Sequence, residues 1–299
     1  MHAPFPDVPF TRTTAGDRGL SVARVEDALQ NRELRRVLRG VYVRNDVAET
    51  QDLRVRAAAL VMPPHHVLCD RTAAWVHGVD VYRFGELDVL PPLDTYALRG
   101  SSRSCRAEYA GGQRDLLPED ICEIDGVRVT TPLRTCMDLG CSRPRWRALA
   151  AMDAFMRVHD IRREEMWRLL PRYFRRRGVV QLRQLIPLAD PRAESVRESR
   201  VRLAIEDAGL PRPVPQHWVT HGGRPVYRLD LAYPHAKVAI EYDGREFHEG
   251  RDQVKADRAR RQWLRERGWT VIVLTKDSFE PDALGVWLAE LRSALRLAA

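Results

Sequence analysis

Two strand ends carrying acidic residues constrain the fold of this chain most. Asp230 lies in an alternating apolar segment, and the apolar run 238–240 leads directly into Glu241 and Asp243. Residues two apart in a strand point to the same face, so Glu241 and Asp243 are expected to share one. A carboxylate beside a buried strand must be desolvated unless a cation or a donor meets it. The pattern predicts an acidic site at the ends of two adjacent strands, with His248 just beyond.

Length and composition predict a globular protein of several domains. The chain has 299 residues, of which 44% are hydrophobic and 30% charged, whereas one domain takes about 100–200 residues. We expect a flexible N-terminus at 1–19, a winged-helix-like domain at 20–83, a middle region of strands and then basic helices at 84–190, and a final domain at 191–299.

The basic balance favours a polyanionic partner. Lys and Arg number 49 against 41 Asp and Glu, which gives a net charge of +8. Arginine forks match phosphate, and each contact releases counterions from DNA. An ordinary solvated surface is the simpler alternative.

The cysteines and the apolar runs indicate a cytoplasmic protein. Five cysteines, an odd number, include no Cys-x-x-Cys pair, which argues against a disulfide framework or a zinc site. Residues 1–19 lack the apolar core of a signal peptide, and no apolar run approaches about 18 residues. We therefore expect no membrane partner.

The N-terminal domain is expected to bind DNA. A helix near 22–29 precedes a segment, 34–43, that alternates apolar and basic residues before Gly40, as a wing does. Helices at 51–62 and 70–78 follow. On its segments 38–42 and 71–78, this region resembles the winged-helix domain of AbiEi-type antitoxins. The wing would place three side chains against phosphate: Arg35, Arg36 and Arg39.

The middle region shows no catalytic pattern. Strands are expected at 86–90 and 126–130, followed by a helix opening at Pro132. The helical segment 143–188 interleaves arginines with aromatics. We expect the aromatics to be buried (Trp146, Phe155, Trp167, Tyr173 and Phe174) and three arginines to form a DNA-binding face (Arg175, Arg176 and Arg177). Residues 189–192 interrupt the helices and predict a domain boundary.

The last third predicts an α/β domain. Ser195 and Glu198 have the spacing of a capping box that opens a helix. Strands are expected at 216–220, 225–232 and 237–242, then a helix at 251–267 and a strand at 269–275. This order gives a mixed sheet with helices on both faces.

Residues 193–278 resemble the restriction-endonuclease-like PD-(D/E)XK superfamily, and more narrowly the branch related to the very short patch repair endonuclease. The resemblance rests on Glu198, Asp230, Glu241, Asp243, Gly244, His248, Asp257 and Arg261. It implies Mg²⁺, or Mn²⁺, held by carboxylates from the set Asp230, Glu241, Asp243 and Glu198, with His248 as general base. Asp243 stands where the superfamily has lysine, so either His248 replaces that lysine or catalysis has been lost.

Two functions follow from these patterns. The first is a metal-dependent DNA endonuclease whose catalytic residues are Asp230, Glu241, Asp243 and His248. The alternative is a non-catalytic DNA-binding regulator of antitoxin type with a degenerate nuclease-fold domain. RNA cleavage is a third possibility on the same motifs. Arg258 and Arg261 are expected to contact DNA, although Arg261 could instead pair with Asp257 along its helix.

Overall fold

The computed structural model describes residues 5–83, 85–243 and 251–297, with side chains omitted at 251–254 and 297. The chain divides into two compact units, Met1–Leu139 and Gly140–Ala299. The division falls within the expected middle region. Within the described ranges, no helix is both long and apolar enough to cross a bilayer.

The first unit begins with two helices and a three-stranded sheet. The sheet has the order β1-β3-β2, with both neighbouring pairs antiparallel. The expected helix and hairpin are present. In chain order, the elements are β1 (Phe10–Thr11), α1 (Arg12–Gly16), α2 (Val22–Gln30), β2 (Leu34–Leu38) and β3 (Val41–Arg44).

The expectation of a flexible segment at 1–19 does not hold for residues 10–16, which form β1 and α1. Phe10 is fully buried, and its ring lies 6.3 Å from that of Tyr42 on β3. Thr11 caps α1 by accepting a hydrogen bond of 3.2 Å from the N–H of Thr14. Burial of Phe10 and this cap order residues 10–16.

A second sheet follows in the same unit, with the order β6-β5-β4-β9-β8 and β7 beside β5. The strand expected at 86–90 is wrong, because Glu86–Asp88 form a 3₁₀ turn. Glu86 accepts a hydrogen bond of 2.9 Å from the N–H of Arg83, and two prolines that cannot donate to a ladder follow at 91 and 92. The elements are α3 (Gln51–Ala59), β4 (His66–Leu68), α4 (Asp70–Val76), η1 (Glu86–Asp88), β5 (Leu93–Leu98), β6 (Tyr109–Ala110), β7 (Gln113–Arg114), η2 (Pro118–Asp120), β8 (Ile121–Ile124), β9 (Val127–Thr130) and α5 (Pro132–Gly140).

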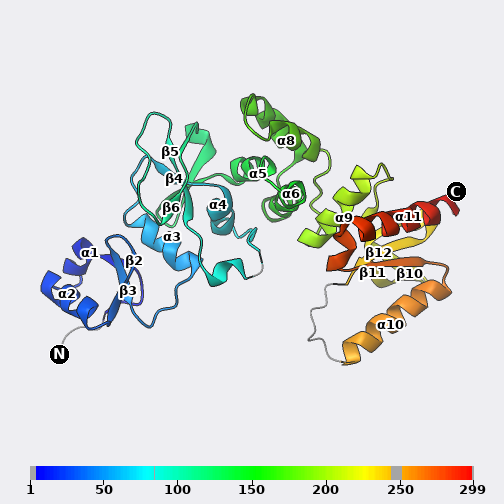
Figure 1. Cartoon of the computed structure of the whole chain (residues 1–299), viewed down its shortest axis with the longest axis horizontal. Helices are drawn as coiled ribbons and strands as arrows, with labels where there is room; N and C mark the ends of the chain where they lie inside the picture. Colours follow the sequence, from blue (N-terminus) through cyan, green and yellow to red (C-terminus); the bar gives the residue numbers. More distant parts are fainter. Residues whose placement is uncertain (1–4, 84, 244–250, 298–299) are drawn as a thin grey trace. The chain divides into compact units, whose positions relative to one another are not determined.

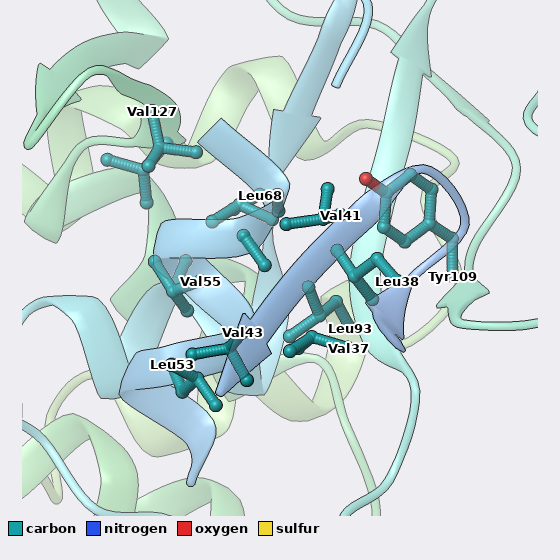
Figure 2. Packing of buried hydrophobic residues seen from close by; sticks show 14 residues of the cluster. Val37, Leu38, Val41, Val43, Leu53, Val55, Leu68, Leu93, Tyr109 and Val127 are labelled. Carbon is teal, nitrogen blue, oxygen red and sulfur yellow. The ribbon is translucent and has the colours of Figure 1, made fainter. Parts of the chain in front are cut away.

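One hydrophobic core joins the hairpin to this second sheet. Figure 2 shows Leu38 and Val41 of the hairpin packed beside Leu68 of β4 and Leu93 of β5, and α3 contributes Leu53 to the same cluster. The hairpin is therefore anchored to the sheet that follows it, while its Leu34 and Tyr42 also pack in a second cluster with Phe10 and Val25 of α2.

The second unit begins with helices α6 (Arg145–His159), α7 (Arg163–Leu169) and α8 (Val179–Leu185), with the 3₁₀ turn η3 (Leu170–Tyr173) between the last two. The burial expected for the aromatics holds for Phe155 and Tyr173 but is wrong for Trp167 and Phe174, which are 43% and 75% exposed. The chain leaves η3 at Phe174 and turns through Arg175, whose φ is 60°. Tyr173 therefore points inward while Phe174 faces solvent.

The C-terminal sheet has the order β10-β11-β12-β13. β11 is antiparallel to both of its neighbours, and β13 is parallel to β12. The expected order of helix, three strands, helix and strand is confirmed, and a further helix follows it. The elements are α9 (Val196–Asp207), β10 (Val214–His221), β11 (Arg224–Tyr233), η4 (Pro234–Ala236), β12 (Val238–Tyr242), α10 (Arg251–Glu266), β13 (Thr270–Leu274), η5 (Lys276–Phe279) and α11 (Pro281–Leu297).

Helices cover both faces of this sheet, as the sequence predicts (Figure 1). On one face, Ile205 of α9 and Leu291 of α11 pack against Ile240 of β12 and its neighbours. On the other face, Leu264 of α10 packs against Ala239. Alternation along β12 thus directs successive residues to opposite helices.

Candidate functional site

Three polar residues form a row across the C-terminal sheet. Asp230 lies one residue before the pair Leu231–Ile240, which brings it level with Glu241 on β12. On β10, Gln216 falls between the residues paired with Leu231 and Leu229, so it is level with Asp230 on the other side. The row Gln216, Asp230 and Glu241 therefore crosses three adjacent strands, and we call it the polar row.

Asp230 is the carboxylate with the fewest partners in this row. It is half-buried, and its Oδ2 accepts a hydrogen bond of 3.4 Å from the N–H of Tyr242. Burial raises the pKa of Asp230 and the charge of Glu241 raises it further, whereas the Tyr242 N–H, Arg260 and Arg228 lower it. In the described part of the chain, no lysine or arginine forms an ion pair with Asp230.

Glu241 and Asp243 face the same helix, as their spacing predicts. Arg261 of α10 lies 3.5 Å from Oε2 of Glu241 through Nε and 3.1 Å from Oδ2 of Asp243 through Nη2. Arg260 lies 2.8 Å from Oε1 of Glu241 and also donates a hydrogen bond of 2.8 Å to the carbonyl of Arg228. Two guanidinium groups thus meet the carboxylates that were expected to bind metal.

Glu198 joins the polar row through Gln216. Its Oε2 accepts hydrogen bonds from Nε2 of Gln216 at 2.8 Å and from the N–H of Glu194 at 3.1 Å. Ser195 caps α9 by accepting a hydrogen bond of 3.1 Å from the N–H of Glu198. Glu198 is only 6% exposed, so it fixes the start of α9 against β10.

The remaining expected site residues have different positions. His248 and Gly244 lie outside the described residues. Arg258 is exposed on α10, whereas Arg261, expected at the DNA, contacts the carboxylates of β12. Within the described residues, no three or more His, Cys, Asp or Glu side chains are placed to hold one metal ion together.

Sequence reasoning missed Gln216 and Arg260. Gln216 has a φ of 54°, a left-handed conformation within β10 that its side chain alone does not signal. Arg260 stands in an arginine-rich helix, next to Arg261, and its partner is distant in the sequence. The sequence does hold one signal for Gln216, because this polar residue opens the expected strand 216–220 directly after a proline-rich connection.

The three arginines of the hairpin in the first unit have different surroundings. Arg35 lies 3.0 Å from Glu49 and donates a hydrogen bond of 2.8 Å to the carbonyl of Val47. Arg36 and Arg39 are exposed. Their side chains are therefore better placed for a phosphate than that of Arg35.

The arginines before α8 are close to aromatic rings. Arg175 and Arg177 are exposed and Arg176 is half-buried. The guanidinium of Arg175 lies 5.2 Å from the centre of the Phe174 ring, and that of Arg176 lies 4.9 Å from the centre of the Tyr173 ring. Arg175 and Arg177 thus lie at the surface together with the exposed Phe174, and their contact with DNA stays a prediction.

Comparison with known families adds to this description. The model of the AbiEi antitoxin C-terminal domain matches residues 66–188. The resemblance given above rests on 20–78, and of its two motifs only 71–78 falls inside the match. Most of the matched range is the middle region, which includes the arginines expected to bind DNA, Arg175 to Arg177.

Two relatives match nearly the full chain. They are the uncharacterised proteins MT2308 of Mycobacterium tuberculosis strain CDC 1551 and Rv2248 of strain H37Rv, each 32% identical over 274 residues, which span 90% of this chain and 96% of the relative. Residues 66–188 of the chain match the AbiEi antitoxin C-terminal domain. Over nearly its full length, the chain belongs to the same family as these two mycobacterial proteins.

Proposed function

We propose that the protein is a DNA-binding regulator of the antitoxin type. The observation that carries the proposal is the match of residues 66–188 to the AbiEi antitoxin C-terminal domain. Before this range and ahead of α3, two helices and a two-stranded hairpin occur in the order typical of a winged helix. The surplus of basic residues agrees with a polyanionic partner.

The first unit would bind duplex DNA with α2 and the hairpin. In a helix-turn-helix, the N-terminal residues of the second helix contact base edges in the major groove. Val22 and Ala23 at the start of α2 are exposed. Arg36 and Arg39 on the hairpin would then contact phosphates, which position the protein without reading sequence.

The hairpin contact is tested with Arg36→Ala/Arg39→Ala in the full chain. A labelled duplex is titrated with each variant, and binding is measured by fluorescence anisotropy. The double variant should bind more weakly than the wild type. The slope of log K against log salt should become shallower by about 0.9 for each phosphate that the hairpin no longer neutralises. Arg44→Ala is the matched control, because Arg44 is half-buried on the same sheet and lies 2.5 Å from Asp46. Equal affinity of the double variant and the control would refute the contact.

A second candidate function is metal-dependent phosphodiester hydrolysis in the C-terminal domain. Asp230 favours it, because a half-buried carboxylate without an ion pair in the described part of the chain suits a hard cation. Asp230 with Glu241 or Asp243 would hold Mg²⁺ or Mn²⁺, which would polarise the phosphoryl oxygen when bound. Arg260 and Arg261 would have to give up part of their contacts with Glu241 and Asp243.

Cleavage of supercoiled DNA with Mg²⁺ or Mn²⁺ tests this candidate. Asp230→Asn keeps the size of the side chain and removes its charge, so metal-dependent nicking should be lost while duplex binding remains. Nicking that persists in Asp230→Asn would rule out the polar row as its site. Duplex binding without cleavage under both metals would rule out hydrolysis and leave the DNA-binding regulator as the remaining candidate function.

A further inference from the structure

Two arginines of α9 stack on aromatic rings beside the end of β12. The guanidinium of Arg197 lies 4.9 Å from the centre of the Tyr242 ring. That of Arg200 lies 3.9 Å from the centre of the Phe279 ring and 4.8 Å from that of Trp146. Tyr242 and Phe279 are themselves stacked, with centroids 6.3 Å apart and planes inclined by 28°. We call Arg197 and Arg200 the stacked arginine pair.

The stacked arginine pair differs from neighbouring arginines in its surroundings. Arg202, on the same helix, lies 3.0 Å from Asp153, and Arg212 lies 2.8 Å from Glu206. Among the described residues, no Asp or Glu forms an ion pair with Arg197 or Arg200, and neither guanidinium donates a hydrogen bond to any of them. Their N–H groups remain available to an anion.

Stacking fixes the orientation of these groups without using their donors. A guanidinium lying flat on a ring keeps its N–H groups at the edge of its plane, and these match a phosphate in a forked geometry. Arg200 is half-buried, and burial lowers its pKa, whereas Tyr242 and Glu280 raise it. A bound anion would offset the cost of burying this charge.

The position of the pair relates it to the polar row. Tyr242 packs with the cluster beneath α9 and α11, whereas Glu241 and Asp243 face α10. The stacked arginine pair and the carboxylates therefore lie on opposite faces of the same strand end. Because residues three apart on a helix are neighbours, Arg197 and Arg200 can contact adjacent phosphates of one strand.

We propose that Arg197 and Arg200 bind consecutive backbone phosphates of duplex DNA, which gives the second unit a DNA contact of its own. The inference rests on the DNA binding proposed above. Phosphate is favoured over an acidic protein segment because the two guanidinium groups lie over aromatic rings, 4.9 and 3.9 Å from ring centres, and form no ion pair with a described carboxylate, which leaves their donors to a forked phosphate contact.

The test compares Arg197→Ala/Arg200→Ala with Arg212→Ala in the full chain. Arg212 is exposed in the same domain but is paired with Glu206, so its removal controls for the loss of surface charge. Duplex affinity is measured by anisotropy from 50 to 300 mM salt. The double variant should lower the salt dependence of log K by about 1.8, which corresponds to two phosphate contacts of about 0.9 each, and Arg212→Ala should leave it unchanged.

Two further measurements distinguish a forked phosphate contact from a simple loss of charge or of fold. Arg200→Lys keeps the positive charge but lacks the paired N–H donors of a guanidinium. Its affinity for duplex DNA should therefore lie between those of the wild type and the double variant. Circular dichroism of each variant checks the fold. If the wild type binds duplex and the double variant keeps its salt dependence, only this inference fails. If the wild type binds no duplex, the proposed function fails with it, and binding of RNA alone would overturn the assignment to DNA.

Discussion

Oε1 of Glu241 lies 2.8 Å from Nη2 of Arg260, which ties β12 to α10 at the candidate site. Glu241 is only 6% exposed, and the guanidinium groups of Arg260 and Arg261 are its ion-pair partners. Arg260→Ala would leave the longer contact of 3.5 Å with Arg261. We predict a loss of about 3 kcal/mol in the free energy of unfolding. Chemical denaturation measures it, with Arg260→Lys as the control that keeps a charge, and a change within experimental error would contradict the importance of this pair.

Asp153 of α6 is predicted to hold α9 in place. It is 1% exposed and accepts hydrogen bonds from the Ser199 hydroxyl at 2.6 Å and from Arg202 at 3.0 Å. Asp153→Ala leaves Arg202 largely buried without its carboxylate, which should cost about 3–5 kcal/mol. Asp153→Asn retains acceptor capacity and should cost less. The two variants are compared by urea denaturation, and equal effects would show that the charge of Asp153 is unimportant.

Asp94 is predicted to make the first unit less stable as pH rises. Burial and the charge of Asp70 raise the pKa of Asp94 to about 6. Its folded pKa exceeds that of the unfolded chain, so the folded state binds the extra proton and stability falls as pH increases from about 4 to about 6. The loss approaches 3 kcal/mol, at about 1.4 kcal/mol for each pKa unit.

Asp94→Asn provides the check on this pH dependence. The amide stays neutral, so the variant should gain stability relative to the wild type between pH 4.5 and 7.5. Hydrogen exchange of β5, measured at both pH values, reports the difference within the first unit. A constant difference between variant and wild type would exclude Asp94 as the titrating group.

Gly178 is predicted to tolerate no side chain. Its φ is 88°, and a Cβ built on it would lie 2.2 Å from the carbonyl oxygen of Cys141. Gly178→Ala should therefore cost more than about 3 kcal/mol, because strain and a backbone clash add. Gly222 has a φ of 57° but open space around it, so Gly222→Ala should cost about 1 kcal/mol. Thermal unfolding of the two variants tests the contrast.

Local patterns predicted the parts of the site that lie within one strand. The shared face of Glu241 and Asp243 follows from the two-residue period of a strand, and the apolar run before them marks β12. The alternating pattern around Asp230 likewise located β11. These features depend only on residues that are close in the sequence, so the sequence alone is enough to predict them.

Contacts between distant segments could not be predicted in the same way. Arg260 and Arg261 meet β12 only because α10 folds back onto the sheet, and helical spacing equally allowed Arg261 to pair with Asp257. The two residues of β1 are too few to show a period, although their pairing with β3 buries Phe10. Tertiary packing, rather than local propensity, determined these positions.

Binding of the full chain to duplex DNA tests the central claim most directly. Anisotropy titrations of the wild type at several salt concentrations, with EDTA and with Mg²⁺, give both affinity and salt dependence. We predict duplex binding that weakens steeply with salt and persists in EDTA, because phosphate contacts dominate and no metal is required. Absence of duplex binding at low salt, or binding that requires Mg²⁺, would contradict the account.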